Sequence, residues 1–209
     1  MFISLEGGEG AGKSFFQKAF AQHLKSLGKN VVLTREPGGT PVADEIRSVF
    51  NCNNKFGEKI EPLTELFLVC AARTQHVQNL IRPALARGDW VICDRFYDST
   101  RIYQGVLGGV DSKVIETALD WCVGDCHPNL TLWIDCPVDV VMNRLGERGS
   151  EDGIARFDDM AKSMHEKLRQ GFMRLEESFA DRFFKLNGEA SAEENIALVM
   201  SEIEMRNGR

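Results

Sequence analysis

The most constraining feature of this 209-residue chain is the segment EGGEGAGKS, residues 6–14, which directly follows a short apolar run. Within it, Gly7, Gly12, Lys13 and Ser14 match G-x-x-x-x-G-K-[ST], the spacing of a phosphate-binding loop. In such a loop, backbone N–H groups and the start of the next helix face a nucleotide phosphate, the lysine spans the outer phosphates, and the hydroxyl can ligate Mg²⁺. The segment predicts a strand, a loop and a helix, with phosphate contacts from Gly7, Gly8, Glu9, Gly10, Ala11, Gly12, Lys13 and Ser14.

Near-continuous apolar runs alternate along the chain with longer segments of helical period. Such runs are typical of strands covered on both faces, and the alternation favours right-handed parallel crossovers in an open α/β sheet. We therefore predict a five-stranded parallel sheet with helices on both faces. The predicted strands are 2–5, 31–34, 90–93, 130–134 and 183–186, and the predicted helices are 13–27, 63–87, 112–124, 138–148 and 158–179.

Residues 51–61, 105–111 and 149–155 fit neither pattern and are interpreted as loops. The last of them is rich in glycine and charge and lies between two predicted helices, near Arg144 and Arg148. A lid that closes over a ligand has this composition, and so does a plain surface loop. We place a short lid at about residues 146–158.

Composition indicates one ordinary globular domain over residues 1–209, with 43% hydrophobic and 27% charged residues. A net charge of -6 argues against a nucleic-acid surface, which needs a basic stripe. Apolar runs fall short of the roughly 20 residues of a membrane helix and a signal-peptide pattern is missing, so we expect a cytoplasmic protein without membrane contact. The six cysteines are expected to be free thiols. Cys122, Cys126 and His127 lack the number and spacing of ligands of a zinc site.

Charged residues follow the predicted strands. Arg35 and Glu36 follow the second strand, Asp94 and Arg95 the third, and Asp135 the fourth. The carboxyl ends of parallel strands line the ligand crevice of an open sheet, so these side chains should gather near the phosphate loop. Extra arginines there would suit an acceptor that itself carries a phosphate.

Further motifs resemble those of bacterial-type thymidylate kinases. They appear in the family's order and approximate spacing, from the N-terminus to about Arg156. Besides the phosphate loop they are TREPGGT (34–40), DEIRS with Arg47, AAR ending at Arg73, CDRF with Asp94 and Arg95, and DSTRIYQG ending at Gly105.

The resemblance implies the P-loop nucleoside monophosphate kinase fold and transfer of the γ-phosphoryl group of ATP to thymidine monophosphate (dTMP), with Mg²⁺. It implies that Lys13, Arg95 and Glu9 act in catalysis, and that Ser14 and Glu36 serve the metal. Glu9 and Glu36 would lie near the sugar and phosphate of the acceptor. The acceptor site it implies consists of Glu36, Pro37, Arg47, Val69, Arg73, Asp94, Arg95, Thr100 and Gln104, of which Arg47 and Arg95 grip the phosphate and Arg73, Thr100 and Gln104 read the base.

The loop carries no arginine, so the resemblance assigns the transition-state arginines to the lid, as Arg148 and Arg156. The chain departs from the family pattern at three places. Val69 replaces a phenylalanine that stacks on thymine, a contact worth about 1–3 kcal/mol, for which Phe67 or another ring could substitute. Phe96 replaces a tyrosine or histidine, and LNGEA (186–190) replaces an Asp-Ala-like pair near the adenine.

Two other functions stay open at this point. One is a kinase for another pyrimidine nucleotide or for a deoxynucleoside, and the other is a non-catalytic ATP-binding switch. The resemblance further implies a homodimer that pairs helix faces. The stripe Leu63, Phe67, Cys70 and Val77 could face either the core or that partner.

Overall fold

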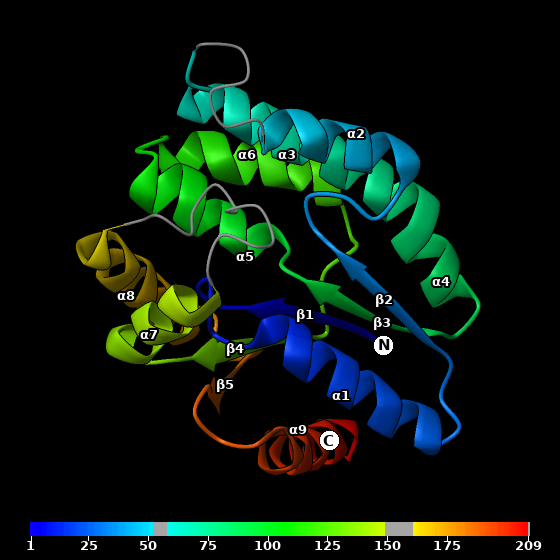
Figure 1. Ribbon diagram of the computed structural model, residues 1–209. Helices are drawn as coiled ribbons and strands as arrows, with labels where there is room; N and C mark the ends of the chain where they lie inside the picture. The colour runs from blue at the N-terminus through cyan, green and yellow to red at the C-terminus, as the bar shows by residue number, and fades with distance from the viewer. Residues whose placement is uncertain (52–57, 149–160, 209) are drawn as a thin grey trace.

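Five strands form the sheet: β1 (Phe2–Glu6), β2 (Val31–Arg35), β3 (Trp90–Asp94), β4 (Leu130–Asp135) and β5 (Phe183–Asn187). The computed structural model describes residues 1–51, 58–148 and 161–208, with Arg148 and Asn207 described by their backbone alone. All strand pairs are parallel, in the order β2-β3-β1-β4-β5 (Figure 1). The predicted five-stranded parallel sheet is confirmed.

Helices connect the strands and cover both faces of the sheet (Figure 1). None of the described helices is long and apolar enough to cross a membrane. They are α1 (Lys13–Ser26), α2 (Pro41–Phe50), α3 (Pro62–His76), the π-helical η1 (Val77–Ile81), α4 (Arg82–Ala86), α5 (Tyr97–Thr100), the π-helical η2 (Arg101–Leu107), α6 (Ser112–Val123), α7 (Val138–Arg148), α8 (Lys162–Ser178) and α9 (Ala192–Asn207).

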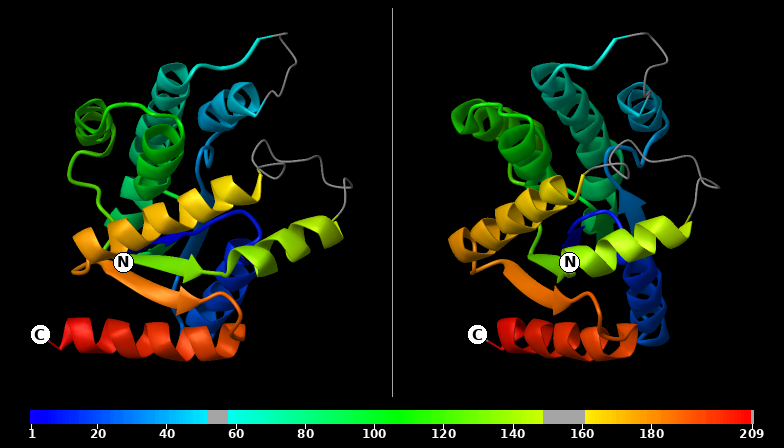
Figure 2. Two further views of the ribbon diagram at one scale, coloured as in Figure 1. Left: turned by 90° about the vertical axis from the view of Figure 1, so that its left-hand side faces the viewer. Right: turned by 60° about the vertical axis from the view of Figure 1, so that its left-hand side comes forward.

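Both faces of the central strands are buried. In β4, Leu130, Leu132 and Ile134 belong to the apolar cluster that α1 and α9 complete. Trp133 points to the other face, where its ring stacks on Phe172 of α8 with centroids 6.3 Å apart. Figure 2 shows α8 and α9 on opposite sides of β4 and β5. This burial of alternate side chains explains why the strands are near-continuously apolar in sequence.

One predicted boundary is wrong. The helix predicted over 63–87 is present as α3, η1 and α4, which follow one another without a break, but the loop predicted over 105–111 begins too early, because η2 extends to Leu107. Gly105, whose residue type favours a loop, lies in η2 where an added Cβ would come within 2.9 Å of Ile115 on α6. The glycine therefore serves the close packing of two helices rather than a turn.

Three helices, α2, α5 and α9, had no predicted range. Helix α2 begins at the cap Thr40, whose side chain accepts a hydrogen bond from the Ala43 N–H at 3.3 Å, and has proline at its first position. Helix α9 begins at Ser191, which forms a capping box with Glu194. Both helix N-termini could have been predicted from the sequence, from the segments TPVADE (40–45) and SAEE (191–194).

Candidate active site

The carboxyl ends of β1, β2 and β3 lead into a cavity of about 310 Å³, called here the central cavity. Residues that directly follow those strands converge there because parallel strands end at one edge of the sheet. The structure places these predicted site residues in its wall: Glu9, Gly10, Gly12, Lys13, Ser14, Glu36, Pro37, Arg47, Val69, Arg73, Asp94, Arg95, Thr100 and Gln104.

The phosphate loop is folded around the side chain of Lys13. Lys13 Nζ donates to the carbonyl oxygens of Gly7 at 3.1 Å and Gly8 at 2.6 Å. Burial, and after it the charge of Arg95, lowers the pKa of Lys13 to about 8. Gly7 has φ +142°, and a Cβ there would lie 2.7 Å from the Ile134 carbonyl oxygen, so only glycine fits. The phosphate loop thus holds the buried ammonium group of Lys13 at the place where the motif predicts the nucleotide phosphates.

Ser14, the predicted metal ligand of the loop, is paired with Asp94. Its Oγ donates to Asp94 Oδ2 at 3.0 Å, and Asp94 Oδ1 is buried without a partner among the described residues. Glu36, the carboxylate expected beside Ser14, has both oxygens bound by Arg73 and His76. Strand order explains the difference, since β3 lies next to β1 whereas β2 is one strand farther away.

Arg95, Glu9 and Tyr103 form a compact group beside the loop. Arg95 Nη2 donates to Glu9 Oε1 at 2.7 Å, and its Nη1 donates to the Gly7 carbonyl oxygen at 2.9 Å. The Tyr103 hydroxyl lies 2.8 and 2.7 Å from the two Glu9 oxygens, and its ring lies under the Arg95 guanidinium. Burial opposes ionisation of Glu9, but Arg95, Lys13 and Tyr103 together hold its pKa below the usual value. Glu9 therefore carries the negative charge that orients Arg95.

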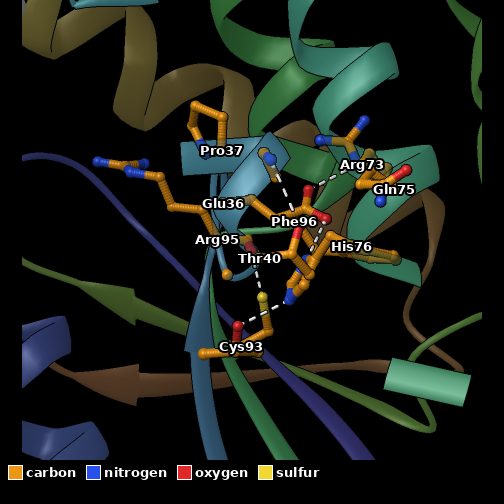
Figure 3. A network of polar contacts seen from close by, with 12 residues as sticks. Glu36, Pro37, Thr40, Arg73, Gln75, His76, Cys93, Arg95 and Phe96 are labelled. Atoms are coloured by element: carbon orange, nitrogen blue, oxygen red, sulfur yellow. Dashed lines mark hydrogen bonds and ion pairs between the residues drawn. The ribbon is translucent and has the colours of Figure 1, made fainter. Parts of the chain in front are cut away.

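Glu36 lies at the centre of a buried polar network between β2 and α3 (Figure 3). Arg73 Nε donates to Glu36 Oε2 at 2.6 Å, and His76 Nδ1 lies 2.9 Å from Oε1. His76 Nε2 in turn contacts Thr34 Oγ1 at 2.7 Å, and Arg73 Nη2 donates to Thr100 Oγ1 at 3.0 Å. Arg73 Nη1 is buried and has no partner among the described residues. The N–H groups of Arg73 Nη1 are thus donors of this network that have no acceptor within the described part of the chain.

The Phe96 ring packs beneath this network. It is fully buried, and the Arg73 guanidinium lies 5.3 Å from its centroid. A tyrosine or histidine at position 96 could make a polar contact. Phe96 instead makes a cation–π contact with Arg73.

Two other predicted acceptor-site residues, Arg47 and Gln104, form hydrogen bonds with groups of the protein. Arg47 Nη1 donates to the Pro37 carbonyl oxygen at 2.8 Å, which fixes the end of α2 against the segment after β2. Gln104 Nε2 donates to Glu65 Oε2 at 3.1 Å. Val69 lines the cavity, whereas Phe67 is 61% exposed and does not, so Phe67 does not substitute for the missing stacking ring.

A second cavity of about 460 Å³ lies across the phosphate loop, between α1 and the segment after β5. Gly188 and Ala190 of the LNGEA segment line it, together with Phe15 and Arg144. Arg144 donates to the carbonyl oxygens of Gly10 at 3.3 Å and Gly188 at 3.0 Å, so it ties the loop to that segment.

The lid predicted at about 146–158 falls mostly outside the described residues, as does Arg156, and the side chain of Arg148 is not described either. The roles given to these two arginines stay predictions. Cys70, Cys93, Cys122, Cys126 and Cys136 are free thiols. Within the described ranges, no three His, Cys, Asp or Glu side chains are grouped as a metal cluster.

A protein-family model described as thymidylate kinase matches residues 5–199 of the chain. The chain belongs to the thymidylate kinase family. The thymidylate kinase of Caulobacter vibrioides is 40% identical over 207 residues, which cover 99% of this chain and 97% of that relative. The thymidylate kinase of Pseudomonas fluorescens is 46% identical over 90% of this chain and 87% of its own length. The crystal structure of thymidylate kinase from Ehrlichia chaffeensis matches with a TM-score of 0.75 at 28% identity, covering 98% of each chain.

Membership in the thymidylate kinase family confirms the family expected from the motifs, the P-loop nucleoside monophosphate kinase fold and the enzyme class, an ATP-dependent dTMP kinase. The comparisons give no support to a kinase for another acceptor or to a non-catalytic switch.

Sequence reasoning missed two side chains of this thymidylate kinase site. His76 holds Glu36, and Tyr103 holds Glu9. The spacing of Arg73 and His76 was a usable signal, because residues three apart share a helix face. Tyr103 lies inside the quoted DSTRIYQG segment, but its target, Glu9, is 94 residues earlier and only the fold brings the two together.

Proposed function

We propose that the central cavity binds dTMP and that the phosphate loop holds the outer phosphates of ATP, so that the γ-phosphoryl group passes between them within one site. The observation that carries this assignment is the buried Arg73 Nη1 without a partner among the described residues. A buried N–H group without an acceptor costs about 1–3 kcal/mol, which a carbonyl oxygen of a pyrimidine ring would recover. Thr100 and Gln104 flank the same cavity and complete the base-reading group.

The acceptor phosphate is assigned to Arg47 and Arg95. Both line the central cavity, one from the end of α2 and the other from the turn after β3. Two guanidinium groups suit a dianionic phosphate, and an uncharged nucleoside would offer them no such charged partner. Phosphoryl transfer depends mainly on such positioning and charge neutralisation.

The donor side is assigned to Lys13, with Mg²⁺ held by Ser14 and Asp94. A hydroxyl and a carboxylate are the hard oxygen ligands that Mg²⁺ prefers, and the buried Asp94 Oδ1 has no hydrogen-bond partner within the described ranges. Bound Mg²⁺ would neutralise charge on the transferring phosphates. This assignment replaces Glu36, whose oxygens already bind Arg73 and His76. The second cavity is assigned to the base of ATP, bounded by Arg144 and the LNGEA segment.

The acceptor assignment is tested by comparing thymidine, dTMP, uridine monophosphate and cytidine monophosphate in a coupled ADP-release assay. We expect dTMP to give the highest kcat/KM, and thymidine the lowest because it leaves Arg47 and Arg95 without a phosphate. A better acceptor than dTMP would refute the assignment.

Replacing Val69 by phenylalanine should tighten dTMP binding at least about fivefold, because base–aromatic stacking contributes about 1–3 kcal/mol. Val69 lines the central cavity, so a ring at this position would face the bound base. Val69→Leu is the matched control, since it adds apolar volume without a π-face. Equal dissociation constants for the two variants, measured by calorimetry, would show that stacking is not what position 69 supplies.

We also propose that the chain forms a homodimer through the exposed side of α3. The apolar stripe of this helix divides: Leu63 and Phe67 are 46% and 61% exposed, whereas Cys70 and Val77 face the core. Helix α6, which packs against α3, exposes Val114 and Trp121. Exposed apolar groups of this kind mark interfaces between protein chains.

Sedimentation at micromolar concentration should give twice the mass of the 23.4 kDa chain. Phe67→Glu should shift the protein to monomer, because a charge on that face would be desolvated in the dimer. Leu198→Glu on α9, at a similarly exposed apolar position on the opposite face of the sheet, is the control and should leave the dimer intact. A wild-type protein that sediments only as monomer would remove the proposal.

A further inference from the structure

Glu6 is a fully buried carboxylate to which neither the motifs nor the proposed function assigns a role. It is the last residue of β1, directly before the phosphate loop, and its side chain has no exposed surface. Both of its oxygens bind the segment that follows β3. Oε1 accepts the backbone N–H of Phe96 at 2.8 Å, and Oε2 accepts the Ser99 hydroxyl at 2.6 Å. Glu6 therefore links the start of the loop to the turn that carries Arg95.

That turn has an unusual backbone. Among the described residues, Arg95 is the one non-glycine residue with positive φ, at +67°. Such a left-handed conformation is unfavourable for a residue with a Cβ and persists where neighbours enforce it. The Arg95 N–H is bound by the Leu5 carbonyl oxygen at 2.9 Å, and the next N–H, that of Phe96, is bound by Glu6. The end of β1 thus holds the backbone on both sides of the Arg95 Cα.

The same carboxylate acts on the Arg95 side chain through Ser99. Because the Ser99 hydroxyl donates its single proton to Glu6 Oε2, its lone pairs are free to accept from Arg95 Nη1, which lies 3.2 Å away. Glu9 holds the other end of the guanidinium at Nη2. Two carboxylates of one segment, residues 6–9, therefore fix the position of the arginine from two directions.

We propose that Glu6 is a positioning residue that sets the backbone and the guanidinium of Arg95 for the acceptor phosphate, and so couples the phosphate loop to the acceptor site. This inference rests on the proposed function of Arg95 as a phosphate ligand. Glu6 itself lies beneath the turn and does not touch the substrate in this arrangement.

The groups around Glu6 shift its pKa in both directions. Burial, and after it the charge of Asp98, raises the pKa of Glu6 to about 7, while Ser99, Arg95 and the Phe96 N–H act in the opposite direction. Lys13 and the Cys93 thiol also lie within its electrostatic reach. Both atoms that contact its oxygens are donors, which matches the ionised form. Binding is therefore measured at pH 8, on the side of this pKa where the carboxylate form is favoured.

The test compares the affinity of the wild type and of Glu6→Gln for dTMP and for thymidine, which differ only in the phosphate. The amide keeps an acceptor for Phe96 but offers N–H to Ser99, which reverses that hydrogen bond and removes the charge. We expect the ratio of dTMP to thymidine affinity to fall at least about tenfold, since hydrogen bonds to a charged group are stronger than those between neutral groups. The affinity for a non-hydrolysable ATP analogue should stay within about twofold.

Two further variants make the result decisive. Ser99→Ala, which keeps the Phe96 contact, should lower the same ratio less than Glu6→Gln does. Ser4→Ala removes another buried hydrogen bond of β1, to Thr131 at 2.9 Å, and should leave the ratio unchanged. If Glu6→Gln does not fold, the Ser99→Ala ratio decides, and an unchanged ratio overturns the inference.

Arg95→Met separates this inference from the proposed function. If Arg95→Met loses the preference for dTMP while Glu6→Gln and Ser99→Ala keep it, the positioning role of Glu6 is wrong and the proposed function stands. If Arg95→Met also keeps the preference, the assignment of Arg95 to the acceptor phosphate fails, and the inference about Glu6 fails with it.

Discussion

Replacing Lys13 by alanine should lower kcat for dTMP phosphorylation by roughly 10²–10³-fold. A preorganised cation aimed at charge that develops in the transition state contributes on this scale. Lys13 is already held in place before any phosphate binds, because its Nζ is bound by the Gly7 and Gly8 carbonyl oxygens. The loss should therefore appear in kcat as well as in the KM for ATP, measured by coupled ADP release.

The stability of the Lys13→Ala protein should change little. Lys13 is a buried cation whose pKa is lowered to about 8, so part of its interaction with the loop is offset by desolvation in the folded state. Lys18 is an exposed residue on the same helix, and Lys18→Ala is the matched control with near-wild-type kcat. ADP release of equal size with and without dTMP, in the wild type, would contradict phosphoryl transfer altogether.

Lys13 also illustrates what the sequence predicts well. The phosphate loop, the strand before it and the helix after it are local in sequence, and their backbone geometry follows from residue types such as Gly7, which is required where the chain approaches the Ile134 carbonyl oxygen. The five strands were predictable for a similar reason, because burial on both faces leaves a continuous apolar run.

Contacts between strand ends were harder to predict. The sequence placed Glu36 and Asp94 at one edge of the sheet, but which of them meets Ser14 depends on the order β2-β3-β1. Apolar runs do not encode that order. The resemblance paired Ser14 with Glu36, whereas in the structure Ser14 contacts Asp94, and Glu36 is bound by Arg73 and His76.

Partners that lie far apart in the chain were missed for a related reason. Glu36 is 40 residues from His76, and Glu9 is 94 residues from Tyr103. These pairs exist because α3 and η2 pack beside the sheet edge, and packing of that kind is not visible in local periodicity. The sequence analysis identified only the glutamate of each pair, Glu36 in TREPGGT and Glu9 in the phosphate loop.

The pair of Glu36 and Arg73 gives the second large expected effect, this time on folding. Replacing Arg73 by leucine should lower the free energy of unfolding by about 3–5 kcal/mol, because it leaves a buried carboxylate without its cation. Both side chains are almost completely buried, at 3% and 4% exposure. The measurement is urea denaturation followed by circular dichroism. Arg87→Ala is the control: Arg87 pairs with Asp89 but is 61% exposed, so the change should stay below about 1 kcal/mol.

A double-mutant cycle distinguishes loss of the ion pair from loss of packing. In Glu36→Gln/Arg73→Leu the uncompensated charge is gone, so the double variant should be more stable than Arg73→Leu alone. Arg73 also packs on the Phe96 ring, and leucine keeps part of that apolar contact. If the effects of the two substitutions simply add, the carboxylate and the guanidinium are not energetically coupled. In that case His76 alone is sufficient to hold Glu36, and the buried network is weaker than its short hydrogen bonds indicate.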